Sequence, residues 1–236
     1  MKAIPKKQPE REIKELFVLG AHLGHKKNRL HPKARKYIYK IINGVSIIDL
    51  AITVDRLTLA KTFLYEEAAQ DKKLLVVVTK KIVNQYVAEL CKQHDIPSIT
   101  TKWLPGLLTN FTTIIKNVKK LQSLKEQKEQ GEWEKFTKHE RVKLDKQLKR
   151  LQRFYGGLVD LAKKPDILIL VDSKKEKNAL IEARRHAIPV VGVIDTNSNP
   201  EQIQYPIVIN DDSSVVLQRV ITELIQSYVK GKVKSE

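Results

Sequence analysis

Four aspartates and two histidines stand where they could bind a metal ion. Asp172, Asp195 and the pair Asp211-Asp212 each follow an apolar run of strand length. Parallel strands end at one edge of a sheet, and ligands gather at that edge. His22 and His25, in Gly-Ala-His-Leu-Gly-His, could fold over the same edge. Imidazole together with carboxylates suits a divalent transition metal such as zinc.

These residues admit more than one interpretation. Because Asp195 ends a buried strand, its carboxylate needs hydrogen-bond donors or a cation. We expect His25, Asp195 and Asp211 to approach one another, and either to share a structural divalent ion (zinc or magnesium) or to form a hydrogen-bonded cluster that pins the N-terminal loop to the sheet. A metal-dependent hydrolase is the enzymatic alternative. The simplest alternative is that the aspartates cap the helices that follow them.

Motifs of nucleotide and hydrolytic enzymes are absent from the sequence. It has no Walker A loop, no Gly-x-Gly-x-x-Gly after a strand, no Gly-x-Ser-x-Gly and no His-Glu-x-x-His. We therefore expect no enzyme, no required cofactor and no small-molecule substrate. The single cysteine, Cys91, excludes a disulfide framework and a cysteine-rich zinc module.

The charge distribution indicates a polyanionic partner. The 236 residues include 44 Lys/Arg and 27 Asp/Glu, a net charge of +17 that is typical of nucleic-acid-binding proteins. Residues 1–40 hold 12 Lys/Arg against 3 Glu, and residues 113–153 hold 13 against 6. These two segments carry +9 and +7, so the rest of the chain is nearly neutral.

Both basic segments supply candidate RNA contacts. In residues 26–37, cations alternate with His31 and Tyr37, and Tyr39 follows; cations neutralise phosphates, and these rings can stack on unpaired bases. Trp103 and Phe111, near the second segment, favour a role as core anchors. The predicted RNA-binding residues are Lys26, Lys27, Arg29, His31, Lys33, Arg35, Lys36, Lys102, Lys116, Lys119 and Lys120.

The elements that position these residues follow an α/β pattern. Runs such as LLVVV, ILILV and VVGVI are apolar at every position, as in parallel strands buried on both faces. This predicts a three-layer, Rossmann- or flavodoxin-like parallel sheet. The expected strands are 74–79, 98–101, 167–172, 190–195 and 206–209, and the expected helices are 51–70, 81–94, 174–186 and 212–228.

The N-terminal part is expected to differ from this alternation. It should contain a helix at 10–19, a basic loop at 22–36, and a hairpin of strands 37–42 and 45–50. Asn43-Gly44 between β-branched runs is the strongest short signal for such a hairpin.

An insertion interrupts the α/β pattern between residues 110 and 161. Two stripes of apolar residues at helical spacing predict an antiparallel coiled-coil α-hairpin. The stripes are Ile114, Val118, Leu121 and Leu124, then Leu144, Leu148, Leu151, Tyr155 and Leu158. Residues 1–109 and 162–236 would then form the α/β domain with its basic N-terminal segment. The lysines on the hairpin either form a solvated face or contact a phosphate backbone, and their net charge favours the latter.

The sequence gives no sign of a membrane or secretory segment. No apolar run approaches the ~20 residues of a membrane span, and residues 1–15 lack the apolar core of a secretory signal. We expect no membrane association.

Collinear motifs run through nearly the whole chain. In chain order they are Gly20-Ala-His-Leu-Gly-His25, His31-Pro-Lys33, Tyr37-Ile38, Asn43-Gly44-Val-Ser-Ile-Ile-Asp-Leu50, Val78-Thr79-Lys80, Trp103-Leu104, Gly106 to Asn110, Gly156-Gly157, Pro165-Asp166, Asp172, Lys175-Glu176, Glu182-Ala183, Ile188-Pro189-Val190, Ile194-Asp195-Thr-Asn-Ser-Asn-Pro200 and Asn210-Asp211-Asp212. In these segments the chain resembles the family of small-subunit ribosomal protein two, of the bacterial and organellar type.

The resemblance implies a structural role at the junction of head and body of the small subunit. It implies binding to 16S-type rRNA, contacts with neighbouring ribosomal proteins, and a location in ribosomes of a bacterial cytoplasm, a plastid or a mitochondrion. Three positions depart from the family pattern: Pro105 replaces a glycine, Lys177 a histidine and Asn199 an aspartate. A nucleic-acid-binding factor outside the ribosome remains the alternative without catalysis.

Overall fold

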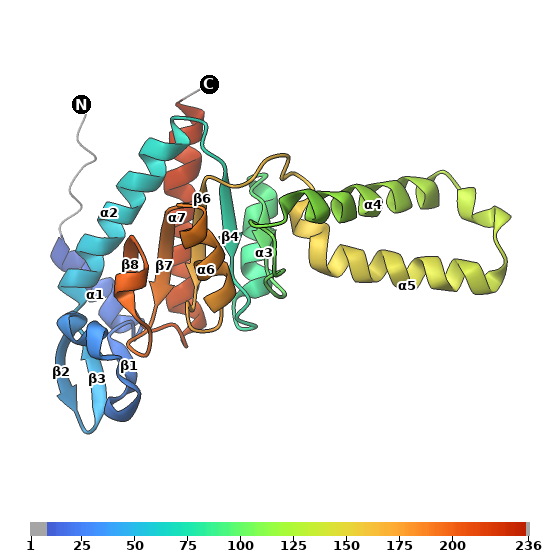
Figure 1. Cartoon of the computed structure of the whole chain (residues 1–236). Coiled ribbons are helices and arrows are strands. Elements are labelled where there is room, and N and C mark those ends of the chain that lie inside the picture. The colour runs from blue at the N-terminus through green and yellow to red at the C-terminus, as the bar shows by residue number, and fades with distance from the viewer. Residues whose placement is uncertain (1–8, 235–236) are drawn as a thin grey trace.

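A five-stranded parallel sheet forms the centre of the molecule (Figure 1). The computed structural model describes residues 9–234. The strand order is β5 (Ser98–Ile99), β4 (Leu74–Val77), β6 (Ile167–Val171), β7 (Val190–Ile194) and β8 (Tyr205–Val208), and every neighbouring pair is parallel. The predicted parallel sheet is confirmed.

The central strands are buried at every position, as their uninterrupted apolar sequences require. Alternate residues serve the two faces: Ile167 and Ile169 join one apolar cluster, and Leu168 joins the other. Gly192 in β7 permits a close approach, because a Cβ there would lie 2.6 Å from Ile203 Cδ1.

Helices cover both faces of the sheet, which makes three layers. On one face lie α2 (Leu50–Ala68), α3 (Asn84–Gln93) and α7 (Ser214–Val233), with α1 (Pro9–Val18) packed on α2. The other face is covered by α6 (Lys177–Arg185), by the segment around Trp103 and by the base of the helical insertion.

Among the helix boundaries that differ from expectation, two have clear physical reasons. Helix α6 begins at Lys177 rather than 174, because Asp172 has a φ of 62° and a turn follows it. Helix α7 continues to Val233, since its last turns pack on α2: a Cβ on Gly231 would lie 2.3 Å from Tyr65 O. Among residues 9–234, no helix combines the length and apolar character of a membrane span.

A small antiparallel sheet precedes the α/β body. It contains β1 (Leu23–Lys26), β3 (Val45–Ile48) and β2 (Ile38–Ile42), in the order β1-β3-β2. The Asn43-Gly44 turn joins β2 to β3 with φ values of 48° and 77°, as a tight hairpin requires.

The region expected as one loop from 22 to 36 contains β1 and two short 3-10 helices, η1 (Lys27–Arg29) and η2 (Pro32–Tyr37). The expectation of a loop was wrong because β1 lacks the apolar alternation of a strand. It exists through its pairing with β3, about twenty residues later.

The insertion is a pair of antiparallel helices that projects from the body (Figure 1). It consists of α4 (Phe111–Glu129), η3 (Glu132–Lys135), α5 (Lys138–Tyr155) and η4 (Gly156–Leu158). A capping box between Thr137 and Glu140 starts α5. The stripe predicted on α4 is buried, whereas no residue of α5 is fully buried. The division into separately folding domains stays a prediction.

Candidate functional site

The N-terminal segment lies across the carboxyl ends of β7 and β8. Thr196, just after β7, accepts a hydrogen bond from His25 N at its Oγ1 (3.0 Å) and one from His31 N at its carbonyl oxygen (2.9 Å). Asn210, after β8, donates from its backbone N to Ala21 O (3.1 Å). Gly24 permits this contact, since a Cβ there would lie 2.6 Å from Thr196 Cγ2.

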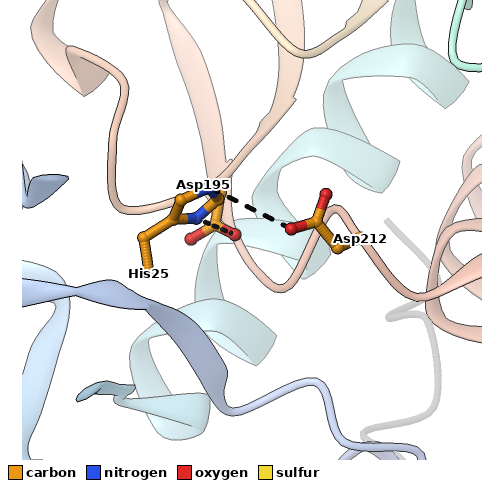
Figure 2. A group of neighbouring side chains, drawn as sticks. All are labelled: His25, Asp195 and Asp212. Carbon is orange, nitrogen blue, oxygen red and sulfur yellow. Dashed lines mark ion pairs between the residues drawn. The ribbon is translucent and has the colours of Figure 1, made fainter.

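His25 lies between two aspartates at this edge (Figure 2). Its Nδ1 is 2.9 Å from Asp195 Oδ2, and its Nε2 is 4.0 Å from Asp212 Oδ2. Asn197 Nδ2 is 3.1 Å from the same Nε2. These contacts fit the tautomer in which Nδ1–H donates to buried Asp195 and Nε2 accepts from Asn197. The approach of His25 to Asp195 is as expected.

Asp212, rather than the predicted Asp211, is the third member of this group. Asp211 faces the other way: its Oδ1 accepts from Lys80 Nζ (2.6 Å), which also contacts Asp212 Oδ1 (3.1 Å). The physical reason is that adjacent residues point in different directions, and Lys80 compensates the buried carboxylate. Burial raises the pKa of Asp211 to about 6, although Lys80 opposes that shift.

The remaining acidic and imidazole candidates have other partners. Asp172 Oδ1 accepts from Lys175 N (3.1 Å) in the turn before α6, so it holds that turn and does not cap the helix, whose N-cap position is Glu176. His22 stacks on Phe17 with the ring centroids 4.1 Å apart. Helix α7 is capped by the Ser213 hydroxyl instead of Asp212, because the Asp212 carboxylate is engaged with Lys80.

The donor set at this edge fits a divalent cation. One atom each from His25, Asp195 and Asp212 lies within 4.8 Å of the others. Ligands about 2.0–2.1 Å from a tetrahedral metal are about 3.3 Å apart, so Asp212, which is exposed, would have to move closer. His25 Nε2 is the ring atom that would bind the ion, in place of its hydrogen bond with Asn197. Asp195 orients the ring in the manner of a carboxylate–histidine–metal arrangement.

The predicted RNA-binding cations are all exposed on the N-terminal segment or at the hairpin. Lys26, Lys27, Arg29, Lys33, Arg35 and Lys36 lie on β1, η1 and η2. Glu201 pairs with Lys33 at 3.0 Å and with Lys36 at 3.9 Å. Lys102 precedes the hairpin, and the others, Lys116, Lys119 and Lys120, are exposed on α4.

The aromatic residues divide between core and surface. Tyr37 is 4% exposed and packs in the core, so its ring cannot stack on a base as proposed from sequence. Tyr39 is 69% exposed. His31 Nδ1 accepts from Lys33 N (3.2 Å) and thereby caps η2. Trp103 is buried and Phe111 packs against the core, in agreement with their expected anchoring role.

Glu182 organises the base of the hairpin and was not anticipated. Its Oε1 accepts from Trp103 Nε1 (3.0 Å) and Gly106 N (2.9 Å), and its Oε2 accepts from Leu108 N (3.0 Å) and Thr109 N (3.4 Å). Burial by itself raises the pKa of Glu182, but these four bonds outweigh it and hold the pKa below its usual value. The sequence offered no signal, because a glutamate inside a charged helix is ordinary.

Comparison with known proteins agrees with these features. The family model for ribosomal protein S2 matches residues 16–231. A small ribosomal subunit protein uS2 from Dehalococcoides mccartyi is 36% identical over 224 residues, which cover 95% of this chain and 91% of the relative. One from Coprothermobacter proteolyticus is 35% identical over 220 residues, covering 93% and 82%. The chain belongs to the ribosomal protein S2 family and is a structural, non-enzymatic constituent of the small ribosomal subunit.

Proposed function

We propose that the chain binds 16S-type rRNA through two basic surfaces and contacts neighbouring small-subunit proteins near the head–body junction. The first surface is the N-terminal segment from Lys26 to Lys36, and the second is the hairpin with Lys102 at its base. One observation carries the proposal: all ten predicted lysines and arginines are exposed, on elements fixed to a nearly neutral body. Three further lysines of the basic N-terminal segment, Lys2, Lys6 and Lys7, lie outside the described residues.

Electrostatic contact with phosphates has a quantitative signature. For each neutralised phosphate, the logarithm of the affinity falls by roughly 0.7–0.9 for every tenfold rise in salt concentration. Replacing the six cations Lys26, Lys27, Arg29, Lys33, Arg35 and Lys36 with Gln should flatten the salt dependence of rRNA binding by several contacts. The four cations without a Glu201 partner should contribute most.

A matched variant controls for net charge. It replaces six exposed lysines of the body with Gln: Lys92, Lys163, Lys164, Lys174, Lys177 and Lys230. Filter binding to a full-length 16S rRNA transcript at several salt concentrations should give the wild-type slope for this control. An equal loss of slope in both variants would contradict a defined RNA surface on the N-terminal segment.

Co-sedimentation separates a ribosomal constituent from a free nucleic-acid-binding factor. Wild-type protein mixed with bacterial small subunits depleted of their own S2-family protein should migrate with them through a sucrose gradient. Protein that binds the transcript but stays at the top of the gradient would favour the free factor.

We also propose that His25 and Asp212 hold one structural divalent ion, zinc or magnesium, while Asp195 orients the imidazole. Charge supports this: among residues 9–234, Asp211 and Asp212 share one lysine partner, Lys80, and Asp195 pairs with His25, so the three carboxylates outnumber the cations that contact them. When bound, the ion would pin the N-terminal sheet to the body, and no turnover is expected.

Elemental analysis tests the ion directly. Wild-type protein purified without chelator should hold about one equivalent of zinc or magnesium, and Asp212→Asn should lose it. Chelator should lower the melting temperature of wild type but not of Asp212→Asn. If wild-type protein holds no metal, and added zinc or magnesium does not change its melting temperature, the proposal of a bound ion is wrong. The N-terminal sheet would then be linked to the body by the hydrogen-bonded cluster alone.

A further inference from the structure

The charges of the hairpin are divided along its length. Its proximal half, residues 111–125 and 146–155, contains eight Lys/Arg and no Asp/Glu. Its distal half, residues 126–145, contains five Lys/Arg and six Asp/Glu. All eight proximal cations are exposed, and within the described chain only Lys149 among them has an ion-pair partner, Asp145 at 2.8 Å. The hairpin is therefore a cationic base with a nearly neutral tip.

The proximal cations lie opposite the seam between the two helices. With about 100° per residue, Lys116, Lys119 and Lys120 fall roughly 140–240° around α4 from the buried Ile114. Lys149, Arg150 and Arg153 fall in the same sector of α5, measured from the apolar residue Leu144 at the seam. These two sets of three are called the α4 stripe and the α5 stripe. Each is continuous, since one member lies three and four residues from the other two, which are adjacent in sequence.

Contacts across the hairpin fix the seam, and with it the direction of the stripes. Asn117 Nδ2 donates to Tyr155 Oη (3.1 Å) near the base, and Lys128 pairs with Asp145 (2.8 Å) towards the tip. Because the seam faces are turned towards each other, the α4 stripe and the α5 stripe point in opposite directions. A single flat anionic surface on one side would meet only one of them.

The width of the hairpin also argues against a single groove. Two helices of about 10–12 Å diameter, with axes about 8–10 Å apart, measure about 18–22 Å across. The major groove of A-form RNA is deep and narrow, and even individual side chains cannot read it. The minor groove is wide but shallow, so it can meet one face of the hairpin and not two opposite faces. Neither groove can therefore hold both stripes.

We propose that the base of the hairpin lies between two separate backbone segments of the rRNA, with the α4 stripe on one and the α5 stripe on the other. The nearly neutral tip extends beyond the RNA contact. In this arrangement the hairpin neutralises two phosphate surfaces that would otherwise repel each other. The inference rests on the proposed rRNA binding and adds to it the number and direction of the contacts.

Site-directed hydroxyl-radical cleavage tests this arrangement. Cys91 is the only cysteine, it is buried, and burial raises its pKa to about 12, so an introduced cysteine is the one reactive thiol. An iron–EDTA reagent is attached to Ser123→Cys on the outer face of α4, to Lys146→Cys on the outer face of α5, or to Glu134→Cys at the tip. Each protein is assembled into depleted bacterial small subunits, and wild type treated with the reagent is the control.

The expected result is cleavage of two non-overlapping rRNA segments from the α4 and α5 positions, with the weakest cleavage from the tip. Cleavage of the same segment from both positions, or from one position only, would overturn the proposal. Since co-sedimentation is measured on the same samples, a protein that fails to enter the subunit contradicts the proposed function instead.

Salt dependence gives a second measurement. Lys116→Gln/Lys119→Gln/Lys120→Gln and Lys149→Gln/Arg150→Gln/Arg153→Gln should each lower the slope of log affinity against log salt by roughly 1.4–2.7, for two to three contacts at about 0.7–0.9 each. The combined variant should show the sum. A slope that responds to only one stripe would overturn the arrangement.

Discussion

Removing one charge from Glu182 should loosen the base of the hairpin. The Glu182 carboxylate accepts four hydrogen bonds, and all four donors belong to residues 103–109. In Glu182→Gln the amide keeps one acceptor oxygen, while its NH2 group faces two N–H donors, whichever carboxylate oxygen it replaces. Two donors then lose their partner, and an unsatisfied buried donor costs about 1–3 kcal/mol. We expect a loss of about 3 kcal/mol in the free energy of unfolding.

Thermal unfolding followed by circular dichroism measures this loss. For a chain of this size, 1 kcal/mol corresponds to about 2–4 °C, so the melting temperature should fall by about 6–12 °C. Exposed Glu89 on α3 accepts one side-chain bond, from Gln85, and Glu89→Gln is the matched control with an expected change within about 0.5 kcal/mol. Equal melting temperatures for Glu182→Gln and Glu89→Gln would refute the reasoning.

The same carboxylate predicts a pH dependence. The folded-state pKa of Glu182 is lowered, so the unfolded chain binds its proton at a higher pH than the folded chain does. The stabilisation is therefore complete above the unfolded pKa, near 4.3, and is lost as the pH falls through the lower folded value. Below about pH 4.3 the difference in stability between wild type and Glu182→Gln should narrow. A difference that stays constant down to the acid limit of folding would contradict a charged Glu182.

Three further predictions concern the hairpin, the N-terminal sheet and the cysteine. Replacing residues 122–147 with a short Gly/Ser linker should leave a cooperative thermal transition, because buried Val118 is retained, but should weaken assembly into small subunits; loss of cooperativity would mean that the hairpin belongs to the core. Gly24→Ala should cost about 1–3 kcal/mol and speed hydrogen exchange in β1, since the new Cβ would overlap the Thr196 side chain; unchanged exchange would contradict the close approach. Native Cys91 should resist iodoacetamide at pH 8 and react fully in urea, as mass spectrometry would show; rapid labelling of the native protein would mean that the thiol is accessible.

The elements that the sequence predicted well are those whose pattern is set by burial alone. The apolar runs of β4, β6 and β7 are buried at every position, so their composition identified both the strands and the parallel sheet. The stripe on α4 was recognisable for the same reason, because its apolar spacing matches one face of a helix.

The features that sequence reasoning missed depend on partners far away in the chain. Asp211 and Asp212 are adjacent, and the buried carboxylate of Asp211 is compensated by Lys80, which lies 131 residues earlier in the chain. The Glu182 carboxylate accepts hydrogen bonds from four donors that lie more than seventy residues earlier in the chain. Such pairings leave no periodic signal, since they are set by the assembled sheet rather than by local spacing.

The carboxyl edge of the parallel sheet shows how this α/β fold acts as a structural scaffold instead of binding a substrate. In such folds, ligands bind beyond the carboxyl ends of the strands. In this chain, that position after β7 and β8 is taken by the chain's own N-terminal segment, through the contacts of His25 with Thr196 and Asp195 and of Asn210 with Ala21. These contacts fix the small antiparallel sheet and the basic residues 26–36 that follow from it. On the other face of the parallel sheet, Glu182 fixes the base of the hairpin. In the proposed binding to rRNA, cations on elements already held in place would lose less entropy when they meet RNA, and the buried polar contacts of the body would contribute to binding without touching the RNA.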